Sequence, residues 1–204
     1  MIRIHNFASG ARGLRLCWQC EEMGLLYETA AVTYPPSEAY LALNPIGNVP
    51  FLEDDGGVAI NESVAIMLHL AGRYGPTPLL PTEDPAVNAR VVQLTVFSEA
   101  SIGAGMNTLM AAHFGAPEAD KRNWSVRGVE RSVEQAFDHV AAVLGDSRFL
   151  VGDDLTLADI AIGTTLGIWR GALGKSLPDR LAAYQAGLAA RPAYQRARER
   201  TQQP

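Results

Sequence analysis

The stretch Asn44–Ser63 constrains the fold more than any other part of the 204 residues. Gly56-Gly57 follows two acidic residues and separates two apolar runs, which is typical of a tight hairpin turn. We therefore predict antiparallel strands at Val49–Glu53 and Val58–Ile60. Pro50 stands at the entrance of the first strand, where a residue without an N–H group is tolerated. A trans proline fits this position and so does a cis bond, and the general cis frequency of about 5–6% favours the trans form.

The residues before position 75 predict an α/β domain in which strand, helix, strand and short helix precede the hairpin and a closing helix. The expected elements are strands at Ile2–Phe7 and Tyr27–Val32, a helix that begins near Arg12, a short helical segment at Ser37–Leu43 and a helix at Ser63–Tyr74. Three prolines between Gly75 and Pro81 deny a continuous helix and indicate a linker.

Strand signals almost vanish after the linker, so the rest of the chain predicts helices. Asp84-Pro85 is a good helix start, and Thr156 with Asp159 three residues later predicts a capping box, with Leu155 facing Ile160. The expected helical stretches run from Asp84 to about His113, from Glu118 to Leu144, from Thr156 onwards, and after Leu177-Pro178-Asp179 and Arg191-Pro192. We interpret the arginines of the last stretch as a solvated helix face. The predicted domains are 1–75, a linker at 76–82, and an all-helical domain at 83–204.

Composition and charge argue against a membrane protein and against a nucleic-acid-binding protein. Hydrophobic residues make up 48% and charged residues 19%, and no apolar run approaches the length of a membrane span, about 18 residues. The N-terminus leads directly into a strand pattern without a secretory signature, so we expect a cytoplasmic protein. The net charge is −5, with four Arg and no Lys before residue 81. Nucleic acid, which requires a clustered positive face, is therefore not an expected partner.

Cys17 and Cys20 have the spacing of a redox motif, but their position argues against that role. A reactive pair sits at a helix N-terminus, where the dipole lowers the thiol pKa. Here Cys17 lies more than one turn inside the predicted helix, on a face with Leu14 and Trp18. We expect Cys17 to be a buried core residue.

Two motifs resemble a known family. Asn44-Pro-Ile-Gly-Asn-Val-Pro-Phe-Leu52, followed by Glu62-Ser63 before an apolar helix, resembles the glutathione-binding half of the cytosolic glutathione S-transferases. Their all-helical C-terminal domain is similar to the stretch Phe149-Leu-Val-Gly-Asp-Asp-Leu-Thr-Leu-Ala-Asp159. The resemblance implies a thioredoxin-like N-terminal domain of order βαβ-ββα with a mixed sheet, followed by a helical bundle.

The same resemblance implies a ligand, glutathione as co-substrate, and no metal. In the family the proline is cis and the backbone before it pairs with the cysteinyl part of glutathione as an added strand would. The Glu-Ser pair holds the γ-glutamyl end, since a helix N-terminus offers N–H groups to a carboxylate. Ordinary helix capping is the alternative for both Glu62 and Ser63. The implied glutathione-binding residues are Asn48, Val49, Pro50, Glu62 and Ser63.

The loop that carries the catalytic residue in the family departs from the family pattern. Family members activate the thiol with a Tyr, Ser or Cys near the start of the first helix, but the usual slots here hold Ala11, Arg12 and Gly13. The hydroxyl left in the loop is that of Ser9. We therefore name Ser9 and Arg12 as catalytic candidates; the alternatives are a plain turn residue for Ser9 and a solvent-facing or carboxylate-binding residue for Arg12.

The resemblance implies a homodimeric detoxification enzyme that conjugates glutathione to a small hydrophobic electrophile. A glutathione-dependent isomerase, peroxidase or disulfide reductase, and a non-catalytic glutathione-binding protein, are the alternatives. The acceptor pocket is expected between the domains, and each of its candidate residues fits the core as well. These candidates are Met106, Leu109, Met110, His113 and Trp169.

Overall fold

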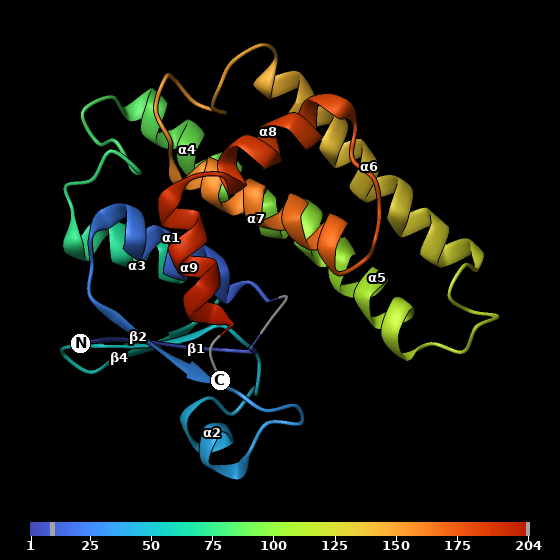
Figure 1. Cartoon of the computed structure of the whole chain (residues 1–204), viewed down its shortest axis with the longest axis horizontal. Helices are drawn as coiled ribbons and strands as arrows, with labels where there is room; N and C mark the ends of the chain where they lie inside the picture. The colour runs from blue at the N-terminus through green and yellow to red at the C-terminus, as the bar shows by residue number, and fades with distance from the viewer. Residues whose placement is uncertain (9–10, 203–204) are drawn as a thin grey trace. The chain divides into compact units, whose positions relative to one another are not determined.

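The computed structural model describes residues 1–8 and 11–202 (Figure 1). The described residues of Met1–Thr77 and Gly187–Pro204 form one compact unit, and Pro78–Ala186 form a second. The C-terminal helix thus groups with the first unit. The domain limits expected from the sequence stay a prediction. Within the described residues, no helix is long and apolar enough to cross a membrane.

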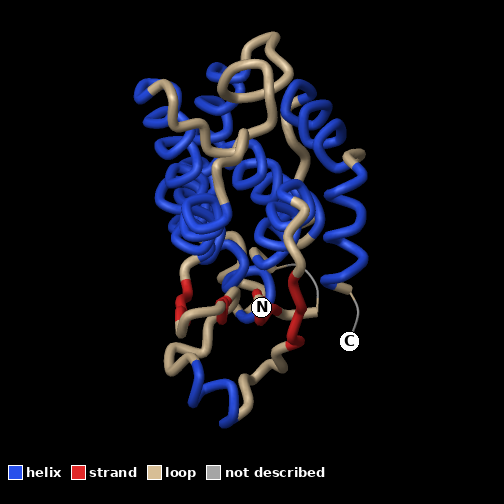
Figure 2. Tube along the Cα trace, turned by 90° about the vertical axis from the view of Figure 1, so that its left-hand side faces the viewer, coloured by secondary structure: helices blue, strands red, loops and turns tan. Residues whose placement is uncertain are grey.

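The first unit contains a mixed four-stranded sheet in the order β2-β1-β3-β4. Its strands are the red segments of Figure 2. The strands are β1 Ile2–Asn6, β2 Tyr27–Ala31, β3 Phe51–Asp54 and β4 Val58–Asn61. β1 runs parallel to β2 and antiparallel to β3, and β3 and β4 form the predicted hairpin. β3 begins at Phe51 rather than at Val49, since Pro50 has no N–H group to donate to the ladder. The thioredoxin-like fold class is confirmed.

The first unit also contains four helices. They are α1 Gly13–Met23, α2 Glu38–Leu43, α3 Ser63–Tyr74 and α9 Pro192–Thr201. Cys17 and Trp18 of α1 are fully buried, as predicted, whereas Leu14, the third residue of the predicted face, is half-buried. Leu16 and Cys20 are buried as well. Burial raises the pKa of the Cys17 thiol to about 12, and burial also raises the pKa of Cys20. Both thiols are therefore protonated at neutral pH, unlike those of a redox pair.

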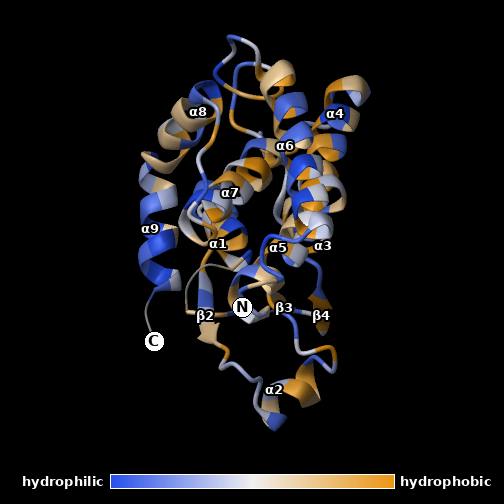
Figure 3. Cartoon of the chain, turned by 90° about the vertical axis from the view of Figure 1, so that its right-hand side faces the viewer, coloured by the Kyte–Doolittle hydropathy of each residue, from blue (hydrophilic) through white to orange (hydrophobic). Residues whose placement is uncertain are grey.

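Helix α9 packs beside α1 (Figure 1) and is hydrophilic over most of its length (Figure 3). The Trp18 and Tyr194 rings meet edge to face, with centroids 5.1 Å apart. Arg191 donates two hydrogen bonds of 2.7 and 2.9 Å to the Glu22 carboxylate, and Arg196 Nε donates to Glu21 at 2.6 Å. A solvated face was therefore the wrong interpretation for Arg191, whose side chain is 28% exposed, whereas Arg196 stays exposed while it pairs with α1.

The second unit is helical. Its helices are α4 Pro85–Phe97, α5 Ala104–Gly115, α6 Trp124–Leu144, α7 Leu157–Gly171 and α8 Asp179–Ala189, the last of which reaches the boundary with the first unit. The predicted helix from Asp84 to His113 is interrupted by a π-helical segment at Ser98–Gly103. α6 begins later than the predicted Glu118 because Asn123 Oδ1 accepts from the N–H groups of Ser125 and Val126, at 3.1 and 3.0 Å, and so caps the helix.

The start of α7 confirms the predicted capping box. Asp159 Oδ2 accepts from the Thr156 N–H group and from the Thr156 hydroxyl, both at 2.9 Å. Its other oxygen accepts from the Leu150 N–H at 2.9 Å and from the Tyr184 hydroxyl at 2.7 Å. Asp159 is fully buried. Removing its carboxylate would therefore leave four buried donors without a hydrogen-bond acceptor, which lowers the stability of the folded state.

Candidate functional site

Ser63, the first residue of α3, is buried against an arginine from α1. Its side chain oxygen accepts a 3.0 Å hydrogen bond from Arg15 Nη1, and Arg15 itself has no exposed surface. A guanidinium has donors and no acceptor, so the Ser63 oxygen must be the acceptor in this bond. The Ser63 hydroxyl hydrogen is therefore directed to another group, and a bound anion can accept it.

Glu62, which precedes Ser63, holds the helix start in a strained conformation. It has φ 68° and ψ 104°, and its side chain makes no capping hydrogen bond. Such a conformation in a non-glycine residue costs about 1–3 kcal/mol and concentrates at functional sites. Since the first N–H groups of a helix have no acceptor within it, α3 presents uncapped donors beside the Ser63 hydroxyl. This combination suits a carboxylate ligand.

The loop before β3 is held by Asn44, which has 2% of its surface exposed. Asn44 Nδ2 donates to the backbone oxygen and to the side chain oxygen of Asn48, at 2.8 and 2.9 Å. The Tyr40 hydroxyl donates to the same backbone oxygen at 2.6 Å. The Val49-Pro50 bond that follows is cis, as the resemblance implies. Two side chains thus fix the loop that sets the Val49 backbone.

The register of the sheet brings the predicted binding segments to one end of it. Phe51 at the start of β3 pairs with Asn61 at the end of β4, and it also pairs with His5 near the end of β1. Pro50, Glu62 and the loop after β1 therefore extend from the same end of three neighbouring strands. A 3.4 Å hydrogen bond from Asn61 Nδ2 to Asn44 Oδ1 adds a direct link between the loop and the start of α3.

The loop after β1 carries the two catalytic candidates. Ser9 lies outside the described residues. Arg12 is the half-buried residue that precedes α1, and its side chain makes no capping bond. Asn6 Oδ1 instead accepts from the Gly13 N–H at 3.2 Å. A Cβ atom on Gly13 would lie 2.2 Å from Asn6 Cγ, so a glycine is required for this close approach.

The comparisons with known proteins identify the family. Family models for the glutathione S-transferase N-terminal and C-terminal domains match residues 12–73 and 117–199. Glutathione S-transferase F10 of Arabidopsis thaliana is 30% identical over 150 residues, which are 69% of this chain and 68% of that protein. The chain belongs to the glutathione S-transferase family.

Two further relatives show the range of this family. Maleylacetoacetate isomerase of Pseudomonas aeruginosa is 34% identical over 129 residues, 60% of this chain and 57% of that protein. The solved structure of Ure2p in complex with glutathione has a TM-score of 0.85 at 21% identity, and the match covers 97% of this chain and 92% of that one. A solved structure with the same fold is therefore of a protein in complex with glutathione. One of the sequence relatives of this chain is an isomerase.

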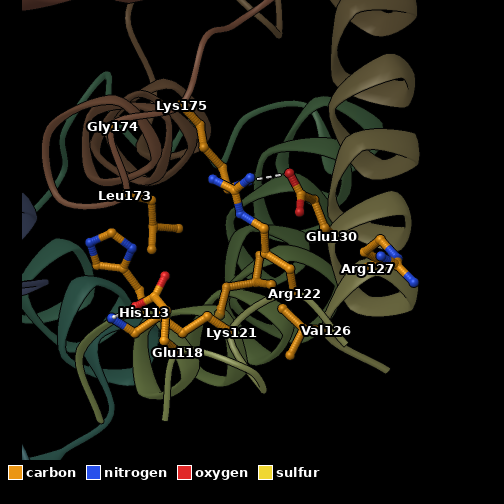
Figure 4. Close-up of a pocket in the computed structure, with 11 residues that line it drawn as sticks. His113, Glu118, Lys121, Arg122, Val126, Arg127, Glu130, Leu173, Gly174 and Lys175 are labelled. Atoms are coloured by element: carbon orange, nitrogen blue, oxygen red, sulfur yellow. Dashed lines mark hydrogen bonds and ion pairs between the residues drawn. The ribbon is translucent and has the colours of Figure 1, made fainter. Parts of the chain in front are cut away.

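The five residues predicted to line the acceptor pocket of this glutathione S-transferase family member do not lie together in one pocket. Leu109 and His113 line a pocket of about 650 Å³ in the helical unit (Figure 4), whereas Met106, Met110 and Trp169 are not among its lining residues. Met106 and Trp169 are buried, with 2% and 1% of their surface exposed. The Trp169 indole donates to the Ser176 backbone oxygen at 2.9 Å, and its ring meets Phe137 edge to face, so Trp169 is part of the helical core.

Sequence reasoning missed Arg15 and Asn44 as supports of the site. A signal for Arg15 was present, because Arg15 and Gln19 are polar residues one turn apart among the apolar residues Leu14, Leu16, Cys17 and Trp18. Both face α3, where Gln19 Nε2 donates to the Met67 backbone oxygen at 2.9 Å. Within the described ranges, no cluster of three or more His, Cys, Asp or Glu side chains is arranged to hold a metal ion.

Proposed function

We propose that the protein is a glutathione transferase that adds the glutathione thiolate to a small electrophile with an apolar body. The observation that carries this proposal is the pair of Ser63 and Arg15 at the uncapped start of α3. A buried hydroxyl whose oxygen already accepts from an arginine, beside uncapped helix N–H groups, is a donor set for a carboxylate.

The proposed binding mode uses the start of α3, which follows β4, and the loop that precedes β3. The γ-glutamyl carboxylate accepts hydrogen bonds from the Ser63 hydroxyl and from the first N–H groups of α3, and Glu62 faces the ligand ammonium. The Val49 backbone pairs with the cysteinyl part as an added strand does, while Asn48 and Pro50 keep that backbone in place. The hydrogen bonds that Asn48 accepts from neighbouring side chains support this role for the loop.

Thiol activation is proposed to involve Ser9 together with Arg12, and Arg12 is the residue that precedes α1. A thiol with a pKa near 8.5 is a few per cent ionised at pH 7, and lowering the pKa by two units requires about 2.7 kcal/mol of preferential thiolate stabilisation. One hydrogen bond from a charged or hydroxyl donor, together with the N-terminal end of the α1 dipole, is of this size. The position of Arg12 immediately before α1 supports its part in this proposal.

The acceptor side of the proposal involves Leu109, Met110 and His113 of α5. Leu109 and His113 line the pocket of the helical unit. Met106 and Trp169 are proposed to support these residues from the core, since both are buried.

The experiment combines conjugation of an aryl halide with the thiolate absorbance of bound glutathione as a function of pH. The proposal predicts turnover and a bound-thiol pKa well below that of free glutathione. Ser9→Ala and Arg12→Gln should raise that pKa and leave glutathione affinity nearly unchanged. Glutathione binding with an unshifted thiol pKa and without turnover would contradict the transferase assignment and leave a binding protein.

A glutathione-dependent isomerase is the second candidate, favoured by the 34% identity to maleylacetoacetate isomerase. An isomerase restores glutathione in each cycle, whereas a transferase consumes one glutathione for each product. Titrating the free thiol during turnover with a cis-enediolone acid and with an aryl halide distinguishes the two. The predicted homodimer, the cytoplasmic location and the detoxification role stay predictions; light scattering at micromolar concentration tests the first.

A further inference from the structure

The sequence between Arg15 and His69 contains no Lys, Arg or His, although it contains eight Asp and Glu residues. This stretch supplies β2, α2, the loop before β3, the hairpin and the start of α3. It therefore includes most of what surrounds the proposed glutathione site. Glutathione has two carboxylates, and the proposed donors at the start of α3 account for the γ-glutamyl carboxylate alone. The carboxylate of its glycine needs a separate account.

The proposed binding mode determines where the glycine of glutathione lies. The γ-glutamyl end is held at the start of α3, and the cysteinyl part pairs with the Val49 backbone. A strand that pairs antiparallel with the loop continues past Val49 towards the residues that precede it, at about 3.3 Å per residue. The glycine, which is the third residue of the ligand, therefore lies beside Asn48 and Gly47.

Uncharged groups surround Gly47 and Asn48. A Cβ atom on Gly47 would lie 3.0 Å from Leu41 Cδ2 and 3.4 Å from Pro36 Cγ, so these two side chains lie directly beside it. Asn48 Oδ1 accepts from Asn44 Nδ2 at 2.9 Å, so the donor that the Asn48 side chain offers is its amide nitrogen. A neutral N–H donor serves a carboxamide oxygen as well as a carboxylate oxygen.

Most basic side chains described in the first unit have a carboxylate partner within that unit. These pairs are Arg3–Glu28, His5–Glu53, His69–Asp54, Arg73–Asp54, Arg191–Glu22, Arg196–Glu21 and Arg200–Glu21. Arg15 donates instead to Ser63, at the proposed γ-glutamyl end. Arg198 lies in the last turn of α9, where Arg200 donates to the backbone oxygen of Tyr27 at the start of β2. Tyr27 pairs with Ile2, so this turn is at the opposite end of the sheet from the site.

Arg12 is the basic residue that the proposed function already assigns to the glutathione thiol. It precedes α1, whereas Gly47 and Asn48 belong to the loop before β3. With Arg12 at the thiol, the glycine carboxylate has neutral partners and water around it. A carboxylate in such surroundings keeps most of its hydration, so its charge contributes little to binding.

We infer that the protein recognises the γ-glutamylcysteinyl part of its thiol substrate and does not recognise the carboxylate of the third residue. The site is that of the proposed function, on which this inference rests. It widens the class of co-substrate to γ-glutamylcysteinyl thiols whose third residue ends in a carboxamide or is joined through an amide to an amine. Such thiols present the same two groups to α3 and to Val49 as glutathione does.

The binding experiment titrates S-methylglutathione and its C-terminal carboxamide into the same protein by calorimetry. Thioethers are used so that ionisation of the thiol does not contribute to the difference. The carboxamide should bind no more than threefold more weakly, whereas a hydrogen-bonded ion pair with the carboxylate would make the difference tenfold or more. A preference for the carboxylate form of more than threefold would overturn the inference.

A lysine introduced beside the proposed glycine position tests where the third residue lies. Ile46→Lys puts an ammonium next to Gly47 at a position that is 73% exposed, so the folded state should tolerate it. S-methylglutathione should then bind about threefold more tightly, the carboxamide should be unaffected, and added salt should remove the gain.

Leu26→Lys is the matched control for this lysine. Leu26 is 88% exposed and precedes Tyr27, which pairs with Ile2 at the opposite end of the sheet, and the change in net charge is the same. Because both ligands are titrated into one preparation, a partly unfolded variant does not change the ratio of their affinities. The same ratio in Ile46→Lys and in Leu26→Lys would show that the third residue does not lie beside Gly47, and would overturn the inference.

Arg12→Gln distinguishes a role of Arg12 at the thiol from a role at the glycine carboxylate. We expect the ratio of the two affinities to be the same in Arg12→Gln as in the wild type. A loss of affinity for S-methylglutathione alone would place Arg12 at the carboxylate and overturn the inference, while the glutathione site would stand. If neither thioether binds to the wild type, the proposed function fails and the inference fails with it.

Discussion

The helix starts at α3 and α7 both carry polar side chains, yet they differ in how their backbone donors are satisfied. At α7, Thr156 and Asp159 form a capping box, and the carboxylate accepts from two further donors of the same unit. At α3, Glu62 makes no capping bond and has a positive φ, while the Ser63 oxygen accepts from a buried arginine. The first start satisfies its donors internally, and the second has no side-chain cap, which is where we propose that glutathione binds.

This difference separates a folding role from a binding role. A capping residue whose bonds all stay within the protein lowers the free energy of the folded state, and its loss is measured in stability. A helix start with backbone strain and uncapped N–H groups raises the free energy of the folded state instead, and such strain concentrates at functional sites. Substitutions at the two starts should therefore change different measured quantities.

The largest expected effect is on stability and comes from α7. Asp159→Ala removes a buried acceptor of four hydrogen bonds, so the free energy of unfolding should fall by about 3 kcal/mol. Urea unfolding measures the loss. Glutathione affinity measured on the folded fraction by calorimetry should stay at the wild-type value. A large loss of affinity in fully folded Asp159→Ala would end the distinction between the two starts.

The next effect concerns the buried carboxylate of Asp54, which ends β3. Burial alone would raise its pKa, but hydrogen bonds donated by the Tyr74 hydroxyl at 2.5 Å and by His69 Nε2 at 2.9 Å outweigh burial and lower the pKa. A lowered folded-state pKa adds stability above the unfolded pKa of about 3.9, and this stability is lost as the pH falls below it.

Asp54→Asn should therefore lower the unfolding free energy at pH 7 by about 2 kcal/mol and flatten its decrease below pH 4. Asp159 cannot produce this decrease, since burial raises its pKa and its contribution has the opposite sign. Urea unfolding at a series of pH values is the measurement, and Asp55→Asn, which removes an exposed carboxylate, is the control. If the unfolding free energy decreased equally steeply below pH 4 in both variants, the decrease would have to come from groups other than Asp54.

A smaller effect separates binding from stability at α3. Arg15→Met removes the buried charge and keeps a similar volume, so stability should change by less than about 1 kcal/mol. Glutathione affinity should fall about tenfold, because the Ser63 hydroxyl loses the donor that orients it. Gln19→Met is the matched control, one turn along the same face of α1, and should lower stability without lowering affinity. Equal glutathione affinities of the two variants would remove Arg15 from the site.

How far the sequence predicted these features depends on the distance between the interacting residues. The capping box at α7 lies within four consecutive positions, so its local pattern was sufficient. The hairpin and cis Pro50 were accessible through a turn signal and a family motif. For Arg15 the sequence offered a polar residue on a buried face but not its role, because its partner Ser63 is 48 residues away. The π-helical segment Ser98–Gly103 was missed because it contains no proline or other strong helix breaker between the two helical stretches.

The smallest expected effect on stability is a gain. Glu62→Gly relieves the positive φ of this residue, and the gain should exceed the extra entropy that glycine loses on folding. The free energy of unfolding should rise by about 0.5–1 kcal/mol, whereas glutathione binding should weaken. The same substitution at Thr156, which has φ −126°, should destabilise the protein. A destabilised Glu62→Gly protein would show that α3 does not store strain at its start.

Calorimetric titration of glutathione into the wild type and into Ser63→Ala tests the central claim most directly. Ser63→Ala removes the proposed hydroxyl donor to the γ-glutamyl carboxylate, which is worth about 1–3 kcal/mol, so affinity measured on the folded fraction should fall roughly 5- to 150-fold. Thr156→Ala, the corresponding change at α7, should leave affinity unchanged and lower the stability. Wild-type affinity in Ser63→Ala would contradict the assignment of the α3 start as the glutathione site.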